Sequence, residues 1–165
     1  MKKPIINDYE SYRDKIHILN PDTGEFVPVA EWEKDSDPTR AEIIAIDTPY
    51  YRLAIYKELF ESETFMNAQK VVDSFTLPGF PHKFRCPTRS ESCVIYDARW
   101  HGLDKALKII GGCPRNTLWW TCERDAEPRL NANGAWYFYG TYGNLGNHSV
   151  YTAYRCQAVT LIDLD

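Results

Sequence analysis

Side chains suited to molecular recognition are concentrated near the C-terminal end of this 165-residue sequence. Between Leu130 and Ile162 the only formally charged residue is Arg155, and tyrosine, asparagine and glycine recur throughout. Tyrosine offers a large, rigid, amphipathic contact, while asparagine, serine and glycine offer adaptable hydrogen bonding, as in antibody loops. We therefore predict a ligand-binding surface over residues 129–151, made by Arg129, Asn131, Asn133, Tyr137, Tyr139, Tyr142, Asn144, Asn147, His148, Ser149 and Tyr151.

The residues that most often carry covalent or metal chemistry do not form a recognisable site. Five cysteines are present, an odd number, with no C-x-x-C pair and no histidine at zinc-site spacing: Cys86, Cys93, Cys113, Cys122 and Cys156. We expect reduced, mostly buried thiols, with a Cys113–Cys122 disulfide as the alternative in an oxidising space. Nothing in the sequence brings His82, His101 or His148 to a serine or cysteine nucleophile. We predict no enzymatic activity, no metal and no cofactor.

Composition limits the remaining function classes. A hydrophobic content of 44% and a charged content of 25% are ordinary for one globular domain with a core. No apolar run approaches the length of a membrane span, and the start of the chain lacks the apolar segment of a signal peptide. The net charge of −4 argues against a nucleic-acid-binding protein, which would present a basic face.

The first half of the chain must supply the scaffold. Residues 1–40 are polar and rich in turns, so we expect an N-terminal arm with one short edge strand at Glu25–Val29, where Pro28 cannot donate to a central ladder. A single domain should follow over residues 41–165. It begins with a hairpin whose strands are Glu42–Ile46 and Tyr51–Tyr56.

Three helical segments are predicted next. Ser62 is the candidate cap of the first, whose apolar residues Phe65, Ala68, Val72 and Phe75 recur at helical spacing. Thr88 and Glu91 form the pattern of a capping box, so a second helix should begin there. A third, Leu103–Ile110, should end at a glycine pair, Gly111 and Gly112.

Strands are predicted at residues 119–122, 135–139 and 153–159, with turns or irregular loops in the Gly/Asn-rich segments between them. We expect Trp119, Trp136, Phe138 and Tyr154 to pack in the core. Alternation along the strand sends Tyr137 and Tyr139 to the face opposite Trp136 and Phe138.

The order of these elements and motifs resembles the C-type-lectin-like domains of the DUF1566 type found in bacterial and phage proteins. Phe84–Glu91 (F-R-C-P-T-R-S-E) is similar to that family's W-R-L-P-T-x-x-E motif, which opens a helix. Trp119–Glu123 (W-W-T-C-E) is similar to Y-W-S-S-x-E, and Ala135–Gly140 to A-W-x-x-x-F-x-x-G. Tyr154–Val159 is similar to the closing V-R-P-V-x-A strand, with Cys-Gln in place of Pro-Val.

A narrower resemblance is to the variable proteins of diversity-generating retroelements. These elements mutate adenines in template codons, which leaves Asn, Tyr, Ser, His, Thr, Asp and Gly scattered between fixed Trp, Ala and Gly. Ile95–Asp104 (I-Y-D-A-R-W-H-G-L-D), the W-W-T-C-E motif and the C-terminal block are similar to such proteins. This resemblance implies that the residues predicted above to bind ligand belong to a diversified surface.

The resemblance implies an α+β, C-type-lectin-like fold, with two helices flanking a small twisted antiparallel sheet and long irregular C-terminal loops. It implies a protein or glycan receptor on a target cell as the partner, bound by a phage tail-fibre tip or a bacterial surface adhesin. The virion or the bacterial surface is then the location, reached by a protein synthesised in the cytoplasm. Tail-tip proteins are commonly trimeric, which is compatible with homo-oligomerisation through the N-terminal arm.

Two other functions remain open at this stage. The first is a non-diversified structural or interaction module of the same fold. The second is an enzyme of the related formylglycine-generating type, which would need a pair of active-site cysteines. Calcium-dependent sugar binding is not expected, because Arg129 replaces the ligand in the only triplet, Glu127-Pro128-Arg129, similar to the E-P-N of sugar-binding C-type lectins.

Overall fold

The structure, a computed structural model, describes residues 15–125 and 133–163. Within these residues eight strands form one sheet in the order β2-β1-β3-β4-β8-β5-β6-β7. Neighbouring strands are antiparallel, except that β5 and β8 pair in parallel at Trp119 and Arg155. The strands are β1 Ile16–Leu19, β2 Phe26–Pro28, β3 Ile43–Asp47, β4 Arg52–Glu63, β5 Leu118–Arg124, β6 Gly134–Tyr139, β7 Asn144–Ser149 and β8 Tyr154–Ile162.

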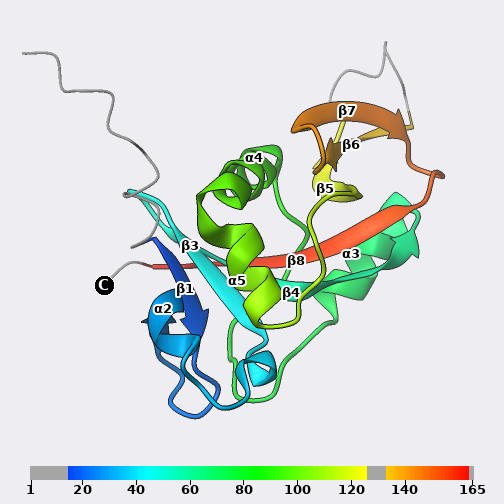
Figure 1. Ribbon diagram of the computed structural model, residues 1–165. Coiled ribbons are helices and arrows are strands. Elements are labelled where there is room, and N and C mark those ends of the chain that lie inside the picture. The colour runs from blue at the N-terminus through cyan, green and yellow to red at the C-terminus, as the bar shows by residue number, and fades with distance from the viewer. Residues whose placement is uncertain (1–14, 126–132, 164–165) are drawn as a thin grey trace, which may run out of the picture.

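Helices cover both faces of the middle of this sheet (Figure 1). One face packs against α4 and α5, and the opposite face against α3. The helical segments are α2 Val29–Trp32, the 3-10 turn η1 Pro38–Arg40, α3 Phe65–Asp73, α4 Arg89–Ala98, the π-helical turn η2 Arg99–Leu103 and α5 Asp104–Ile109. The fold is therefore α+β, as the sequence predicts.

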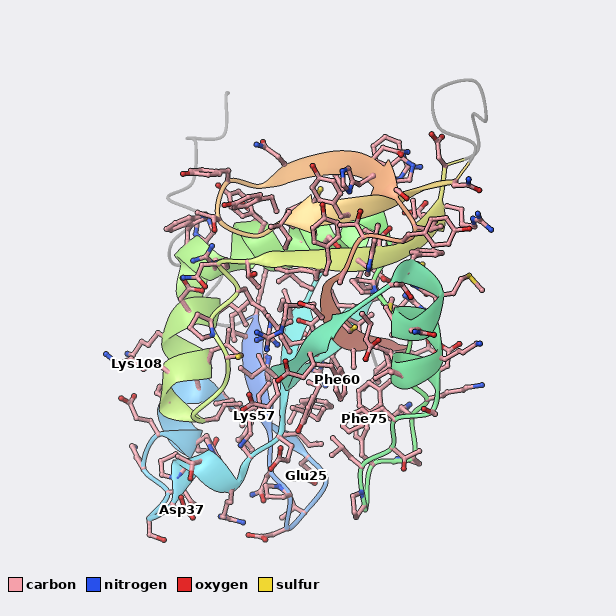
Figure 2. All side chains as sticks on the ribbon, turned by 90° about the vertical axis from the view of Figure 1, so that its right-hand side faces the viewer. Glu25, Asp37, Lys57, Phe60, Phe75 and Lys108 are labelled. Carbon is pink, nitrogen blue, oxygen red and sulfur yellow. The ribbon has the colours of Figure 1, made fainter. Side chains whose placement is uncertain are left out.

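Burial on both faces explains the unbroken apolar runs of the predicted hairpin. Ile44 and Leu53 belong to the core beneath α4 and α5, whereas Ile43 and Ala54 belong to the core beneath α3. The hairpin itself is confirmed, because β3 pairs with β4 in continuous antiparallel register. Aromatic side chains complete the second core. Phe60 and Phe75 lie beside each other in Figure 2, with ring centroids 4.9 Å apart.

The predicted N-terminal arm contributes two strands to the same sheet. In β1, Ile16 and Ile18 are fully buried in the core beneath α4 and α5. Pro28 lies in β2, which forms one edge of the sheet, as predicted from its missing N–H. The described part of the arm thus packs against the rest of the chain.

The predicted helices are present, with one wrong boundary. Thr64, and not Ser62, occupies the N-cap position of α3, because β4 continues through Ser62 to Glu63. The capping box of α4 is confirmed, since both reciprocal hydrogen bonds of Thr88 and Glu91 are made. The third helix ends at Gly111, whose φ of 71° only glycine adopts readily.

The prediction of irregular loops between the C-terminal strands is wrong for residues 144–149, which form β7. All six residues of β7 pair with β6 in register, from Tyr139–Asn144 to Gly134–Ser149. The sequence Asn-Leu-Gly-Asn-His-Ser carries no apolar alternation, because a strand at the edge of a sheet need not bury either face. The sheet is consequently larger than predicted, and it is mixed and not wholly antiparallel.

The predicted core aromatics separate into two groups. Trp119 and Phe138 are fully buried, as expected. Trp136 and Tyr154 are only half-buried, so the prediction that they pack inside the core is wrong for the exposed half of each side chain. The cysteines are free, and Cys113 and Cys122 are not bridged. Cys86 and Cys156 are buried, whereas Cys93 is exposed.

Candidate ligand-binding face

The three-stranded part of the sheet formed by β5, β6 and β7 has two faces of different character. Registered pairs place Trp119 beside Phe138 on the face towards α4, and Trp120 beside Tyr137 on the face turned away from it. The rings of Trp119 and Phe138 stack at 5.1 Å, and Trp119 donates from Nε1 to Ser92 Oγ at 3.1 Å. The predicted alternation of Phe138 against Tyr137 is therefore confirmed.

The face towards α4 is where the motifs that carry the family resemblance meet. The Glu123 carboxylate accepts a hydrogen bond from the Arg89 backbone N–H at 2.6 Å, at the start of α4. The Cys122 N–H donates to the Pro87 carbonyl at 2.8 Å. The Arg89 guanidinium lies 4.6 Å from the ring centroid of Trp136. These contacts tie β5 and β6 to the helix start and so fix the position of the opposite face.

Glu91, buried in the first turn of α4, stabilises the start of that helix through hydrogen bonds with Arg85 and Thr88. It is 4% exposed and accepts hydrogen bonds from Arg85 at 2.6 and 2.8 Å and from the Thr88 N–H at 2.8 Å. Burial raises the pKa of Glu91, but the hydrogen bonds from Arg85 and Thr88 outweigh it and hold that pKa below its ordinary value. The buried carboxylate is thus ionised and paired.

The opposite side of the sheet is a tyrosine face, which we define as Tyr137, Tyr139, Asn144, Gly146 and His148 of β6 and β7, together with Tyr142 and Tyr154. In Figure 2 the strands β5, β6 and β7 lie at the top, with α4 behind them, so this face is turned towards the viewer. Tyr137 and Tyr154 lie with ring centroids 4.9 Å apart, and Tyr139 and Tyr142 lie 5.2 Å apart. The aromatic side chains thus form two groups of rings in contact on one face, and we call the two groups together the platform.

A glycine allows Tyr137 to lie across the neighbouring strand. Gly146 is directly opposite Tyr137 in the register of β6 and β7. A Cβ atom at Gly146 would come within 2.3 Å of the phenol ring, which is closer than real side chains approach. Any other residue at position 146 would therefore displace Tyr137 from the platform.

His148 is held in place although it is exposed. Its Nδ1 lies 2.7 Å from the Thr152 hydroxyl and 3.4 Å from the Tyr154 hydroxyl. Its ring centroid is 6.1 Å from that of Tyr154 and 6.4 Å from that of Tyr137. When the Thr152 hydroxyl donates to Nδ1, the imidazole carries its proton on Nε2 and keeps that donor for a ligand.

Two exposed tyrosines extend the face at its ends. Tyr142, in the turn between β6 and β7, is 67% exposed, and Tyr151, after β7, is 75% exposed. Large aromatic side chains that are exposed beside a group of other rings are typical of contact surfaces.

The structure does not bring all of the predicted ligand-binding residues together. Asn147 and Ser149 pair with Trp136 and Gly134 and so lie on the face towards α4. Asn133 is exposed at the start of β6. Arg129 and Asn131 lie outside the described residues. Five of the predicted ligand-binding residues do lie together on the tyrosine face. They are Tyr137, Tyr139, Tyr142, Asn144 and His148.

Two residues of the site were missed by the sequence reasoning. Tyr154 was predicted in the core but contributes an edge of the platform, and Thr152 orients His148. The alternation of Tyr154 with Cys156 and Ala158, which share the core beneath α3, could have placed Tyr154 on the tyrosine side. No sequence signal predicts the contact of Thr152 with His148.

The tyrosine face presents no formal charge. Arg155 is the only formally charged residue between Leu130 and Ile162, and it donates to the carbonyls of Phe60 and Leu59 at 2.7 and 2.8 Å. Its guanidinium is therefore directed at the backbone of β4. Recognition by these residues depends on ring contacts and neutral hydrogen bonds, and the exposed Arg124, opposite Ala135 in the register of β5 and β6, is a charged neighbour on the same side.

Three of the five thiols, those of Cys86, Cys122 and Cys156, are poorly suited to nucleophilic chemistry. Burial raises the pKa of Cys86 and of Cys122, and it raises that of Cys156 to about 11. These groups therefore stay protonated near neutral pH, whereas a nucleophilic cysteine needs its thiolate. Among the described residues, no cluster of three or more His, Cys, Asp or Glu side chains could hold a metal ion.

A separate hollow of about 330 Å³ lies between the β3–β4 turn and α4, lined by Asp47, Thr48, Val94 and Asp97 among others. The Asp47 carboxylate is held by Arg52, whose Nε lies 2.6 Å from Oδ1. A carboxylate that lines the hollow is therefore already paired with an arginine, in contrast to the neutral side chains of the platform on β6 and β7.

Comparison of the sequence with protein-family models and with curated protein sequences gives no match. In the described part of the chain, no helix is long and apolar enough to cross a membrane.

Proposed function

We propose that this chain is a ligand-binding protein of C-type-lectin-like fold. Its tyrosine face, together with neighbouring residues of the 129–151 segment, recognises a protein or glycan receptor on a target cell, as a phage tail-fibre tip or a bacterial surface adhesin does. The observation that carries the proposal is that alternate residues of β6 lie on opposite faces of the sheet. Phe138 is buried against α4, while Tyr137 and Tyr139 lie on the other side, on the platform.

The fold part of the proposal is supported by the contacts between motifs. F-R-C-P-T-R-S-E and W-W-T-C-E are far apart in sequence, yet Arg89 and Glu123 bind each other at the start of α4. Residues with this role are constrained by the scaffold, whereas Tyr142, Asn144 and His148 of the tyrosine face are exposed. This pattern is what a fold that carries a variable surface requires.

The chemistry of the face favours a neutral contact area on the receptor. Tyrosine rings and asparagine amides bind apolar, hydroxyl and amide groups, and the face lacks the cations that nucleic-acid backbones require. We therefore expect the part of the affinity that the tyrosine face contributes to change little with ionic strength, and we propose neither nucleic acid nor an enzymatic substrate as the ligand.

Diversification by a retroelement is the second part of the proposal, and it is tested in the genome. A reverse transcriptase gene and an adenine-rich template copy of codons 129–155 should lie close to the gene for this chain. Their absence would reject diversification and leave a non-diversified interaction module of the same fold.

Recognition itself is tested with the full chain on an array of bacterial surface polysaccharides and immobilised surface-protein extracts. Tyr142→Ala and His148→Ala should each reduce binding to the recognised component at least tenfold. Tyr50→Ala is the matched control, because Tyr50 is 87% exposed in the β3–β4 turn, away from β6 and β7. Equal binding by all three variants would reject the tyrosine face as the binding surface.

A further inference from the structure

The two edges of the sheet differ in how they are protected against pairing with another strand. β2 is three residues long and ends in Pro28, which has no N–H to donate. β7 is six residues long and pairs with β6 without a bulge. It contains no proline, lysine, arginine or carboxylate. Charges, prolines and bulges are the devices by which natural sheets block their edges, and β7 has none of them.

The direction of the backbone groups of β7 follows from its register. The Val150 N–H donates to the Asn133 carbonyl at 2.7 Å, so this pair is hydrogen-bonded. Hydrogen-bonded pairs alternate along an antiparallel ladder, so Asn144, Gly146 and His148 bond to β6. The N–H and C=O groups of Leu145 and Asn147 and the N–H of Ser149 therefore point outward, while the Ser149 C=O already accepts a hydrogen bond from the Thr152 N–H at 3.0 Å. Among the described residues, no strand lies beyond β7 to receive them.

We propose that β7 pairs antiparallel with β7 of a second copy of this chain. An open strand is complementary to itself in the antiparallel direction, because each outward N–H meets an outward C=O. In a register centred on Asn147, Leu145 lies opposite Ser149 of the second copy, and Gly146 lies opposite His148. No opposed pair carries like formal charges, so the net charge of −4 on each chain does not prevent contact at this edge.

One side chain of β7 supports a second copy as the occupant. Leu145 is 39% exposed at this edge and would be covered by a neighbouring strand. Asn147 lies at the centre of the proposed register, where its outward N–H and C=O would meet those of the same residue in the second copy.

The pairing has a consequence for recognition. A two-fold axis that relates two antiparallel edge strands is perpendicular to the sheet, so the two tyrosine faces lie on the same side. The pair would present a doubled platform and bind a repetitive receptor with avidity. The pairing of β7 does not depend on the proposed function, which holds for a monomer as well.

The experiment is sedimentation-velocity ultracentrifugation of the full chain over a range of about 1–200 μM. The wild type should shift from one to two copies as concentration rises, and Leu145→Lys should weaken this association at least tenfold by placing two cations at the edge. Leu161→Lys is the matched control, because Leu161 is 43% exposed on β8 and should leave association unchanged. Circular dichroism on each variant verifies that it is folded.

Amide hydrogen exchange identifies the edge directly. The outward N–H groups of Leu145, Asn147 and Ser149 should be protected at high concentration and exchange rapidly in dilute wild-type protein. A wild type that stays monomeric at 200 μM would overturn the proposal, and so would a dimer whose outward β7 amides stay unprotected. Tyr142→Ala should dimerise like the wild type, so loss of ligand binding and loss of pairing are distinguishable.

Discussion

The two faces of the β5-β6-β7 sheet use aromatic residues for different purposes. On the side of α4, Trp119 and Phe138 are fully buried, and the neighbouring polar groups are bonded across long sequence separations. On the other side, Tyr139 packs on Tyr142, whereas Tyr137 packs on Tyr154, on His148 and against the edge of the core beneath α3. A surplus of aromatic residues in one sequence segment thus serves both a scaffold and a contact surface.

Strand β6 contributes side chains to both faces. Alternation along β6 gives each face its own set of side chains, so substitutions at Tyr137 or Tyr139 do not touch the packing of Phe138. Stability and recognition can therefore change independently, which is the condition for a surface that varies.

The largest effect is expected at Trp119. Its side chain is fully buried, stacks on Phe138 and hydrogen-bonds to Ser92. Trp119→Ala should lower the free energy of unfolding by about 3–5 kcal/mol, as other large-to-small core substitutions do. Urea denaturation measures the change. Tyr139→Ala, on the other face, is the control, and an equal loss there would contradict the division between the faces.

The next effect is expected from Glu91 and has a defined pH dependence. Its pKa is lowered in the folded protein, so its ionised form stabilises the fold above the unfolded-state pKa of about 4.3, and that contribution is lost as the pH falls through the lower folded-state pKa. Glu91→Gln should cost about 1–3 kcal/mol at pH 7 and less at pH 3. Unfolding curves at the two pH values measure this difference. A loss that does not shrink on acidification would show that Glu91 acts by packing and not by charge.

A smaller effect is expected at Trp136, which lies on the scaffold side but is only half-buried beneath Arg89. Trp136→Ala should cost about 1–2 kcal/mol, less than Trp119→Ala, because less apolar surface is lost. Thermal unfolding of both variants ranks them. Arg89→Lys keeps the charge but not the planar contact, so it should retain only part of the stabilisation. If Trp136→Ala matched Trp119→Ala, the scaffold side would be uniformly buried.

The sequence predicted those parts of the fold whose signals are local. The capping box of Thr88 and Glu91 requires only residues three positions apart, and the hairpin of β3 and β4 is marked by apolar runs on either side of a turn. β7 could not be found in this way, because Asn144–Ser149 takes its structure from β6 and contains no pattern of its own.

The sequence predicted the residue types of the binding surface better than it predicted which face of the sheet each residue occupies. Alternation gave the correct side for Tyr137, but it could not tell that α4 begins only at Arg89 and leaves Trp136 half-covered. Asn147 and Ser149 are residue types that often make ligand contacts, yet the register of β7 places their side chains on the face towards α4. Which face a residue occupies within an edge strand depends on register, and register is a property of two strands.

The smallest effect on stability is expected where the effect on binding is largest. Tyr142 is 67% exposed and packs chiefly on Tyr139, so Tyr142→Ala should change the free energy of unfolding by no more than about 0.5 kcal/mol. Thermal unfolding beside Tyr50→Ala measures this, since that tyrosine is exposed on a turn remote from the tyrosine face. A large loss of stability from Tyr142→Ala alone would mean that the platform supports the fold, and the two faces would then not be independent. If Tyr142→Ala lost receptor binding but kept its stability, Tyr142 would be a recognition residue, because the substitution would have removed a contact with the receptor and not one that stabilises the fold.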